Sequence, residues 1–273
     1  MNQRAADSRR NPHLIRPERR GLRDATAFRI GKVSRNPRDA IRRLGLEVSR
    51  YPLHSTLDGH LRWLLDRLQV TTVLDIGANE GQFATKLRHA SRFEGKVLSF
   101  EPFPDARSVL ERSATSDPLW TSLPVALGDN DEFLTLNTFA GTDWNSLHAP
   151  DHQNLDFVGR AIQSTGSVPV DVRRLDSIWD TFVGSGETVF LKSDTQGHDF
   201  QVLAGAGDRF NEIVGLLVEL SVVPFYEGEP TLPEALLRVA DLGYAPTGFF
   251  PVARRRDSAA LTTVDVCFVR SDD

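Results

Sequence analysis

Cysteine is nearly absent from this chain of 273 residues, which contains one cysteine and one methionine. Cys267 alone can form no internal disulfide and cannot build a cysteine-based zinc cluster. No apolar run approaches the roughly 20 residues that a membrane-spanning helix needs, so we expect no integral membrane protein. The first 21 residues contain no apolar h-region, so we also expect no secretory signal peptide. These absences favour a reduced, cytoplasmic enzyme or binding protein.

The charges that sum to the net value of -5 are distributed unevenly along the chain. Residues 1–50 contain fourteen Lys and Arg against five Asp and Glu, whereas residues 51–273 contain eighteen against thirty-two. A basic arm can dock on nucleic acid or anionic lipid, but a solvated extension explains the same composition. The acidic remainder does not favour a dedicated nucleic-acid enzyme. We predict a basic, partly flexible and partly helical N-terminal extension (1–50) and a larger domain (51–273).

After Val70, short apolar runs alternate with helical segments. The runs are VTTVLDIG (70–77), KVLSFE (96–101), SLPVALGD (122–129), TVFLKSD (188–194) and VGLLVEL (214–220). Apolar strands separated by helices are typical of a parallel sheet covered on both faces. Two stretches interrupt this rhythm. Residues 133–147 and 167–175 predict extra strands inserted after the third strand, and residues 244–250 and 261–269 predict a final antiparallel pair.

The first predicted strand runs into the string DIGANEG, which spans residues 75–81. Glycines at a strand-to-helix turn allow the backbone to approach a ligand, and the helix N-terminus offers free N–H groups. Asn79 stands where the dinucleotide fingerprint G-x-G-x-x-G has a glycine, which argues against a dehydrogenase. A carboxylate at Asp75 followed by Gly77 and Gly81 suits a cationic, amino-acid-bearing ligand. A simple tight turn is the alternative.

Glu101 ends the second predicted strand, which Pro102 stops. An acidic residue at this place holds a ribose diol in doubly wound nucleotide-binding folds. Because the Asp75 turn lies at the expected distance upstream, we favour ribose binding over the alternative, a solvated loop carboxylate.

Four strings, in this order and spacing, resemble the FkbM family of S-adenosylmethionine-dependent methyltransferases: VLDIGANEGQFA, SFEPFPDA, LKSDTQGHDFQVLAGA and LLVEL. The resemblance runs from roughly Tyr51 to Val269, and LKSDTQGHD is its most specific string. Ser193 stands where the family usually has an apolar residue, and His198 where a small or aromatic residue is common. Neither departure threatens the fold, although His198 could alter the active site.

The resemblance implies an α/β fold of the class I methyltransferase (Rossmann-like) type, with a mostly parallel seven-stranded sheet and a terminal antiparallel strand. It implies S-adenosyl-L-methionine as the cofactor. The ribose maps onto Glu101, and the methionine part maps onto the first loop, at Asp75, Gly77, Asn79 and Gly81. Adenine is expected near Ala126, Leu127, Gly128 and Asp129. Asp129 would accept the adenine amino hydrogen, unless it forms an Asx turn with Asn130.

Methyl transfer to a hydroxyl needs alignment of the acceptor and either a base for its proton or a metal at its oxygen. We expect these groups after the fourth and fifth strands, beside the cofactor crevice. Asp194 and Glu219 stand there, and His198 is a third candidate base. A helix cap is the alternative for Asp194, and a capping or surface role for His198. A divalent metal is not favoured, because the ligand set is incomplete.

Residues of the insert and the tail are candidates for the acceptor pocket. Asn145 and Ser146 could line it, with plain turn residues as the alternative. Trp144, Phe249 and Phe250 could form an apolar wall, although aromatic residues on strands are more often core.

The sequence favours O-methylation of a hydroxyl on a small molecule or glycan, such as a sugar, glycolipid or polyketide natural product. Methylation of protein or nucleic acid is the alternative. Base-amino methyltransferases usually have an Asp/Asn-Pro-Pro-aromatic turn where this chain has SDTQG, so we expect no nucleic-acid partner. A non-catalytic cofactor-binding member of the fold is a third hypothesis, and a homo-oligomer stays open.

Overall fold

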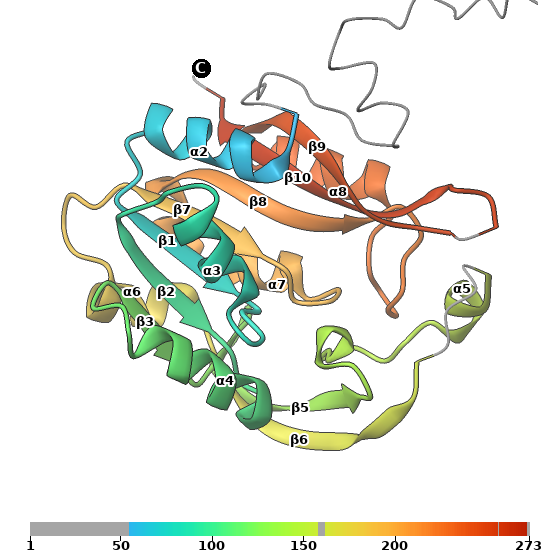
Figure 1. Cartoon of the computed structure of the whole chain (residues 1–273). Helices are drawn as coiled ribbons and strands as arrows, with labels where there is room; N and C mark the ends of the chain where they lie inside the picture. The colour runs from blue at the N-terminus through green and yellow to red at the C-terminus, as the bar shows by residue number, and fades with distance from the viewer. Residues whose placement is uncertain (1–54, 158–161, 256, 272–273) are drawn as a thin grey trace, which may run out of the picture. The chain divides into compact units, whose positions relative to one another are not determined.

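The computed structural model describes residues 55–157, 162–255 and 257–271. The predicted N-terminal extension (1–50) lies outside these ranges. The described part of the chain folds around a seven-stranded sheet in the order β3-β2-β1-β7-β8-β10-β9 (Figure 1). Its strands are β1 (Thr72–Ile76), β2 (Lys96–Phe100), β3 (Trp120–Leu123), β7 (Val189–Ser193), β8 (Ile213–Ser221), β9 (Tyr244–Arg254) and β10 (Leu261–Arg270).

The sheet is mostly parallel, as predicted. Neighbouring strands from β3 through β8 pair in parallel. β10 runs antiparallel to both of its neighbours, β8 and β9. The predicted antiparallel pair at residues 244–250 and 261–269 is therefore confirmed, and the architecture is the α/β arrangement that the sequence predicts.

Helices cover both faces of the sheet because side chains alternate along each strand. Val73 and Phe190 pack with residues of α2, α3 and α4, whereas Leu74 and Leu191 pack with residues of α6, α7 and α8. The helices are α2 (Leu57–Arg67), α3 (Gln82–His89), α4 (Pro104–Ala114), α5 (His152–Phe157), α6 (Leu175–Phe182), α7 (Asp199–Gly205) and α8 (Leu232–Asp241). Two short 3-10 helices are η1 (Thr142–Trp144) and η2 (Gly207–Glu212).

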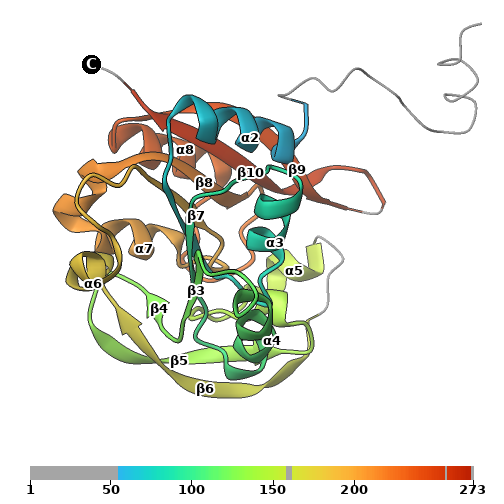
Figure 2. The same ribbon diagram turned by 60° about the vertical axis from the view of Figure 1, so that its left-hand side comes forward.

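A second, three-stranded sheet is inserted between β3 and β7 (Figure 2). It consists of β4 (Ala126–Leu127), β6 (Ser164–Arg173) and β5 (Glu132–Phe139), in that order across the sheet. The predicted extra strands are thus confirmed. The string SLPVALGD is not one strand, however: Pro124 follows the end of β3, and the next residues join the second sheet. Proline has no N–H for a central ladder, which explains the break.

Within the described ranges, no helix combines the length and the apolar character needed to cross a bilayer.

We expect Leu191→Ala to destabilise the fold by about 2–5 kcal/mol, because it leaves a cavity in the middle of the sheet. Leu191 is completely buried. Leu237→Ala is the matched control, since Leu237 on α8 is 66% exposed, and it should change the free energy of unfolding by less than about 0.5 kcal/mol. Urea unfolding followed by circular dichroism measures both, and equal losses would contradict the two-face packing.

Candidate functional site

A cavity of about 640 Å³ lies at the carboxyl ends of the parallel strands. It is lined by the loops after β1, β2 and β7, by β8 and β10, and by parts of α2, α3 and the insert. This volume is in the usual range of small-molecule sites, about 300–1,000 Å³. Six of the nine residues predicted to hold the cofactor or to act in catalysis line it: Gly77, Asn79, Glu101, Asp194, His198 and Glu219. The structure therefore brings the two halves of the predicted site together.

The loop after β1 has the tight backbone that its glycines predict. Gly77 has a φ of 71°, and a Cβ built on it would lie 2.0 Å from the carbonyl oxygen of Asp194. Only glycine fits this close approach between the first loop and the loop after β7. Asn79 also has a positive φ, 49°, a conformation that asparagine adopts more readily than most residues. Gly81, with a φ of 86°, is the N-cap of α3 and does not line the cavity.

Glu101 connects this loop to the end of β2 through hydrogen bonds. Its Oε2 accepts the N–H of Asn79 at 2.8 Å, and its Oε1 accepts the N–H of Phe103 at 2.8 Å. The side chain is 7% exposed, and burial raises its pKa although the two backbone hydrogen bonds oppose the change. Each carboxylate oxygen can accept a second hydrogen bond, which a pair of ribose hydroxyls would donate.

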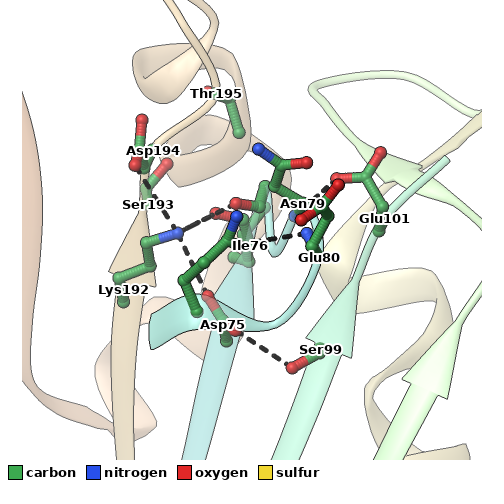
Figure 3. Close-up of polar contacts among 12 residues, drawn as sticks. Asp75, Ile76, Asn79, Glu80, Ser99, Glu101, Lys192, Ser193, Asp194 and Thr195 are labelled. Carbon is green, nitrogen blue, oxygen red and sulfur yellow. Dashed lines mark hydrogen bonds and ion pairs between the residues drawn. The ribbon is translucent and has the colours of Figure 1, made fainter. Parts of the chain in front are cut away.

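Asp75 does not line the cavity, contrary to the direct ligand contact that we predicted. It is fully buried beneath the loop (Figure 3). Its carboxylate accepts a hydrogen bond from Ser99 Oγ at 3.0 Å and lies 3.1 Å from Lys192 Nζ. The ammonium group that neutralises Asp75 thus belongs to the protein, and Asp75 can act on a ligand only through the loop.

Three carboxylates face the cavity on its other side. Asp194 follows β7, where its Oδ1 accepts a hydrogen bond from Gln196 Nε2 at 2.9 Å. Glu219 and Asp265 lie directly opposite each other on β8 and β10, and both line the cavity. Burial, followed by the charge of Asp194, raises the pKa of Glu219 well above its usual value and that of Asp265 to about 7.

Sequence reasoning missed Asp265, although a signal was present. Asp265 interrupts the apolar string LTTVDVCFV just as Glu219 interrupts LLVELSVV. A charge in such a string is costly unless it is paired or functional. Among the described residues, no group of three or more His, Cys, Asp and Glu has an arrangement that could hold a metal ion.

The surroundings of His198 make it a weak base. Its Nδ1 lies 3.0 Å from Nε2 of His148, a second histidine that the sequence did not single out. Burial, followed by the charge of His148, lowers the pKa of His198 to about 4, so the ring is neutral at physiological pH. Although His198 precedes α7, its side chain makes no capping hydrogen bond.

Ser193, the other departure from the family pattern, forms a hydrogen bond to the buried carboxylate of Asp199. Its hydroxyl donates to Oδ1 of Asp199 at 2.5 Å, and the N–H and hydroxyl of Thr195 donate to the same oxygen. Burial raises the pKa of Asp199. A serine at this strand end therefore helps to fix the turn between β7 and α7.

Ala126 and Leu127 line the cavity, as expected for a surface against adenine, but Asp129 does not. The chain turns away with the second sheet there, and the carbonyl of Asp129 accepts a hydrogen bond from Arg174 Nη1 at 2.7 Å. Because Asp129 does not line the cavity, the structure does not support its predicted contact with adenine.

The acceptor side differs from prediction in its aromatic wall. Trp144 and Asn145 line the cavity, whereas Ser146 is buried and donates to the carbonyl of Gln196 at 2.6 Å. Phe249 is half exposed on β9, and Phe250 packs against His60 with ring centroids 5.4 Å apart. Neither of these two phenylalanines lines the cavity, and Phe250 belongs to the apolar core that contains residues of α2. Phe225 lines it instead, with its ring centroid 5.8 Å from that of Trp144.

Comparison with known proteins identifies relatives of this chain. The sequence profile "Methyltransferase FkbM domain" matches residues 75–246. "Methyltransferase 1" of Beauveria bassiana (strain ARSEF 2860) is 27% identical over 159 residues, which cover 54% of this chain and 64% of that protein. The chain therefore matches slightly less than two thirds of that relative's length.

Two solved structures with some likeness to this chain are named as methyltransferases. Methyltransferase FkbM from Methylobacillus flagellatus KT matches with a TM-score of 0.44 and 17% identity, over 72% of this chain and 43% of that one. Magnesium protoporphyrin IX methyltransferase from Synechocystis PCC 6803, solved with bound SAM, matches with a TM-score of 0.44 and 12% identity, over 85% of this chain and 90% of that one.

We expect Asp265→Asn to change how stability depends on pH. The pKa of Asp265 is raised to about 7 in the fold, whereas an exposed aspartate titrates near about 3.9. Between these two pKa values the folded state binds more protons than the unfolded chain. The contribution of Asp265 to the free energy of unfolding therefore falls as the pH rises from about 4 to 7. Asp265→Asn should remove that loss and be more stable than wild type at about pH 8.

Urea unfolding of both proteins between about pH 4 and 8 measures the difference. Asp208→Asn, at an exposed position, is the control and should keep the wild-type pH dependence. If Asp265→Asn also keeps the wild-type slope, the carboxyl of Asp265 does not titrate as its surroundings indicate.

Proposed function

The chain belongs to the FkbM family of methyltransferases, whose profile covers residues 75–246, and on this premise we propose that it is an S-adenosylmethionine-dependent O-methyltransferase. Its proposed acceptor is a hydroxyl on a small molecule or glycan, such as a sugar, a glycolipid or a polyketide natural product. The observation that carries the proposal is the joint lining of one cavity by Gly77, Ala78 and Asn79 of the loop after β1, by Glu101 and by the carboxylates of Asp194, Glu219 and Asp265.

The residues on one side of the cavity fit the cofactor. The oxygens of Glu101 each have a free position for a ribose hydroxyl, and Ala126 and Leu127 offer an apolar surface for a purine. The narrow turn from Gly77 to Gly81 suits the methionine part. S-adenosylmethionine, when bound, supplies a methyl group activated by a positively charged sulfur.

The residues on the other side suit an acceptor hydroxyl, which is a poor nucleophile until its proton has a place to go. The backbone of Asp194 itself approaches Gly77 closely, so we assign the carboxylate of Asp194 the hydrogen bond to the acceptor. Glu219 and Asp265 form a pair in which both pKa values are raised, and the pKa of Asp265, about 7, suits proton exchange near neutral pH. Asp194 and this pair together would accept the proton that the hydroxyl loses.

The charge of the cavity also bears on the alternative acceptors. A nucleic acid would bring phosphates next to three carboxylates, and like charges at close range are repulsive. The acidic lining therefore supports an uncharged or cationic acceptor over a nucleic acid. The low pKa and the buried Nε2 of His198 favour a supporting role for this histidine beside the second sheet.

Titration calorimetry with S-adenosylhomocysteine tests the cofactor assignment. We expect wild type to bind and Glu101→Gln to lose at least about tenfold in affinity, equivalent to about 1.4 kcal/mol, because the ribose hydroxyls lose a charged acceptor. The matched control is Glu111→Gln on α4, whose side chain is 55% exposed. It should bind like wild type, and a folded wild type that does not bind would refute the cofactor.

Methyl transfer is tested by following S-adenosylhomocysteine formation with a panel of hydroxyl, amine and carboxylate acceptors. We expect turnover with hydroxyl acceptors only. Asp194→Asn should then lower kcat by about 10²–10⁴, the usual contribution of a positioned acid or base, while leaving cofactor affinity nearly unchanged. Asp241→Asn, at an exposed end of α8, is the control. Turnover with amines alone would contradict O-methylation.

A further inference from the structure

Lys192 is a buried cation at the centre of the site, and the proposed reaction gives it no task. It is the fourth residue of β7 and is 6% exposed. Its Nζ donates to the carbonyl oxygens of Ile76 at 3.2 Å and Gly77 at 2.9 Å. The same nitrogen lies 3.1 Å from Asp75 Oδ1 and 3.8 Å from Asp194 Oδ2 (Figure 3).

These partners keep Lys192 charged despite its burial. Removing an ammonium group from water is costly unless opposite charges and acceptors surround it. Burial lowers the pKa of Lys192, but the charges of Asp75 and Asp194 outweigh burial and raise it above its usual value. The ring of Phe83 adds a cation–π contact, with its centroid 5.5 Å from Nζ. Lys192 is thus a fixed positive charge in the wall of the cavity.

Its contacts hold the first loop from the side that faces β7. On the side that faces β2, the loop is already fixed, because the N–H groups of Gly77 and Ala78 donate to the carbonyl of Phe100 and that of Asn79 donates to Glu101. The carbonyls of Ile76 and Gly77 point the other way, to Lys192. One side chain therefore connects the end of β1, the start of the loop and the carboxylate of Asp194.

We propose that Lys192 is a positioning residue that fixes the Gly77–Gly81 loop against Asp194, and so sets the cofactor side of the cavity relative to its acceptor side. The ligand named in this inference rests on the proposed function. The position of the loop, by contrast, can be measured on the protein without a ligand. The competing explanation is that Lys192 only neutralises the buried charge of Asp75.

A double substitution separates the two explanations. Lys192→Gln leaves Asp75 buried without its counter-charge and can fail to fold, so it is paired with Asp75→Asn/Lys192→Gln, which removes both charges. Lys96→Gln is the matched control. Lys96 is a partly buried lysine at the amino end of β2, remote from the loop along that strand, and it is paired with Glu187 at 2.5 Å.

Three readouts apply to each variant: melting temperature, affinity for S-adenosylhomocysteine, and hydrogen exchange of peptides covering residues 76–81 and residues 213–221. In the double variant we expect a melting temperature close to that of wild type. We also expect amide exchange at least about tenfold faster in residues 76–81 only, and at least about tenfold weaker S-adenosylhomocysteine binding. Lys96→Gln should lower the melting temperature without changing exchange in residues 76–81.

Recovery of wild-type exchange and affinity in the double variant would overturn the proposal, because neutralising Asp75 would then be the whole role of Lys192. If wild type itself binds no S-adenosylhomocysteine, the proposed cofactor fails. The exchange of residues 76–81 still decides the role of Lys192 in that case: local acceleration supports positioning, and unchanged exchange refutes it.

Discussion

The position of β1 in the main sheet determines where every part of the candidate site lies. β1 has β2 on one side, which follows it directly, and β7 on the other, which returns after the entire second sheet. The chain adds strands outward in both directions from this pair, and the cavity lies at the carboxyl ends of these strands, lined by the loops after both of them. Glu101 comes from one half and Asp194 and Glu219 from the other. Neither half alone could enclose a ligand, and their junction requires a glycine at Gly77 because the two loops touch there.

Charge is the second constraint on this crevice. Several carboxylates around the cavity interact with the charge of Lys192, those of Asp75, Glu101, Asp194, Glu219 and Asp265. Burial, followed by the charge of Asp194, raises the pKa of Glu219 and of Asp265, and Lys192 offsets only part of this rise. The same burial that fixes Asp75 in its ionised pair thus leaves the cavity wall able to exchange a proton near neutral pH.

Sequence reasoning succeeded where a local pattern was sufficient. Fully apolar runs predicted the parallel strands, and Glu101 was placed correctly by its position at the end of one of them. The partner of Asp75 could not be predicted in this way, because Lys192 approaches it only when β1 and β7 pair. Asp265 had a local signal, a charge within an apolar string, but its position opposite Glu219 depends on the register of β10 against β8. Pro124 was a local signal that separated β3 from β4, and it was overlooked. Phe249 and Phe250 were misplaced because their faces depend on the pairing of β9, which residue type does not reveal.

The distance along the chain between β1 and β7 also affects how the protein is made. Their pairing joins residues 117 apart, as at Thr72 and Val189, and contacts of such long sequence separation form slowly. When β1, β2 and β3 have left the ribosome, β1 still exposes one edge of unpaired N–H and C=O groups until β7 is synthesised. Open strand edges in partly folded chains promote aggregation. The antiparallel pair of β5 and β6 is complete before β7 is synthesised and can fold during this interval. The order of synthesis therefore leaves one edge of the central strand open until β7 emerges.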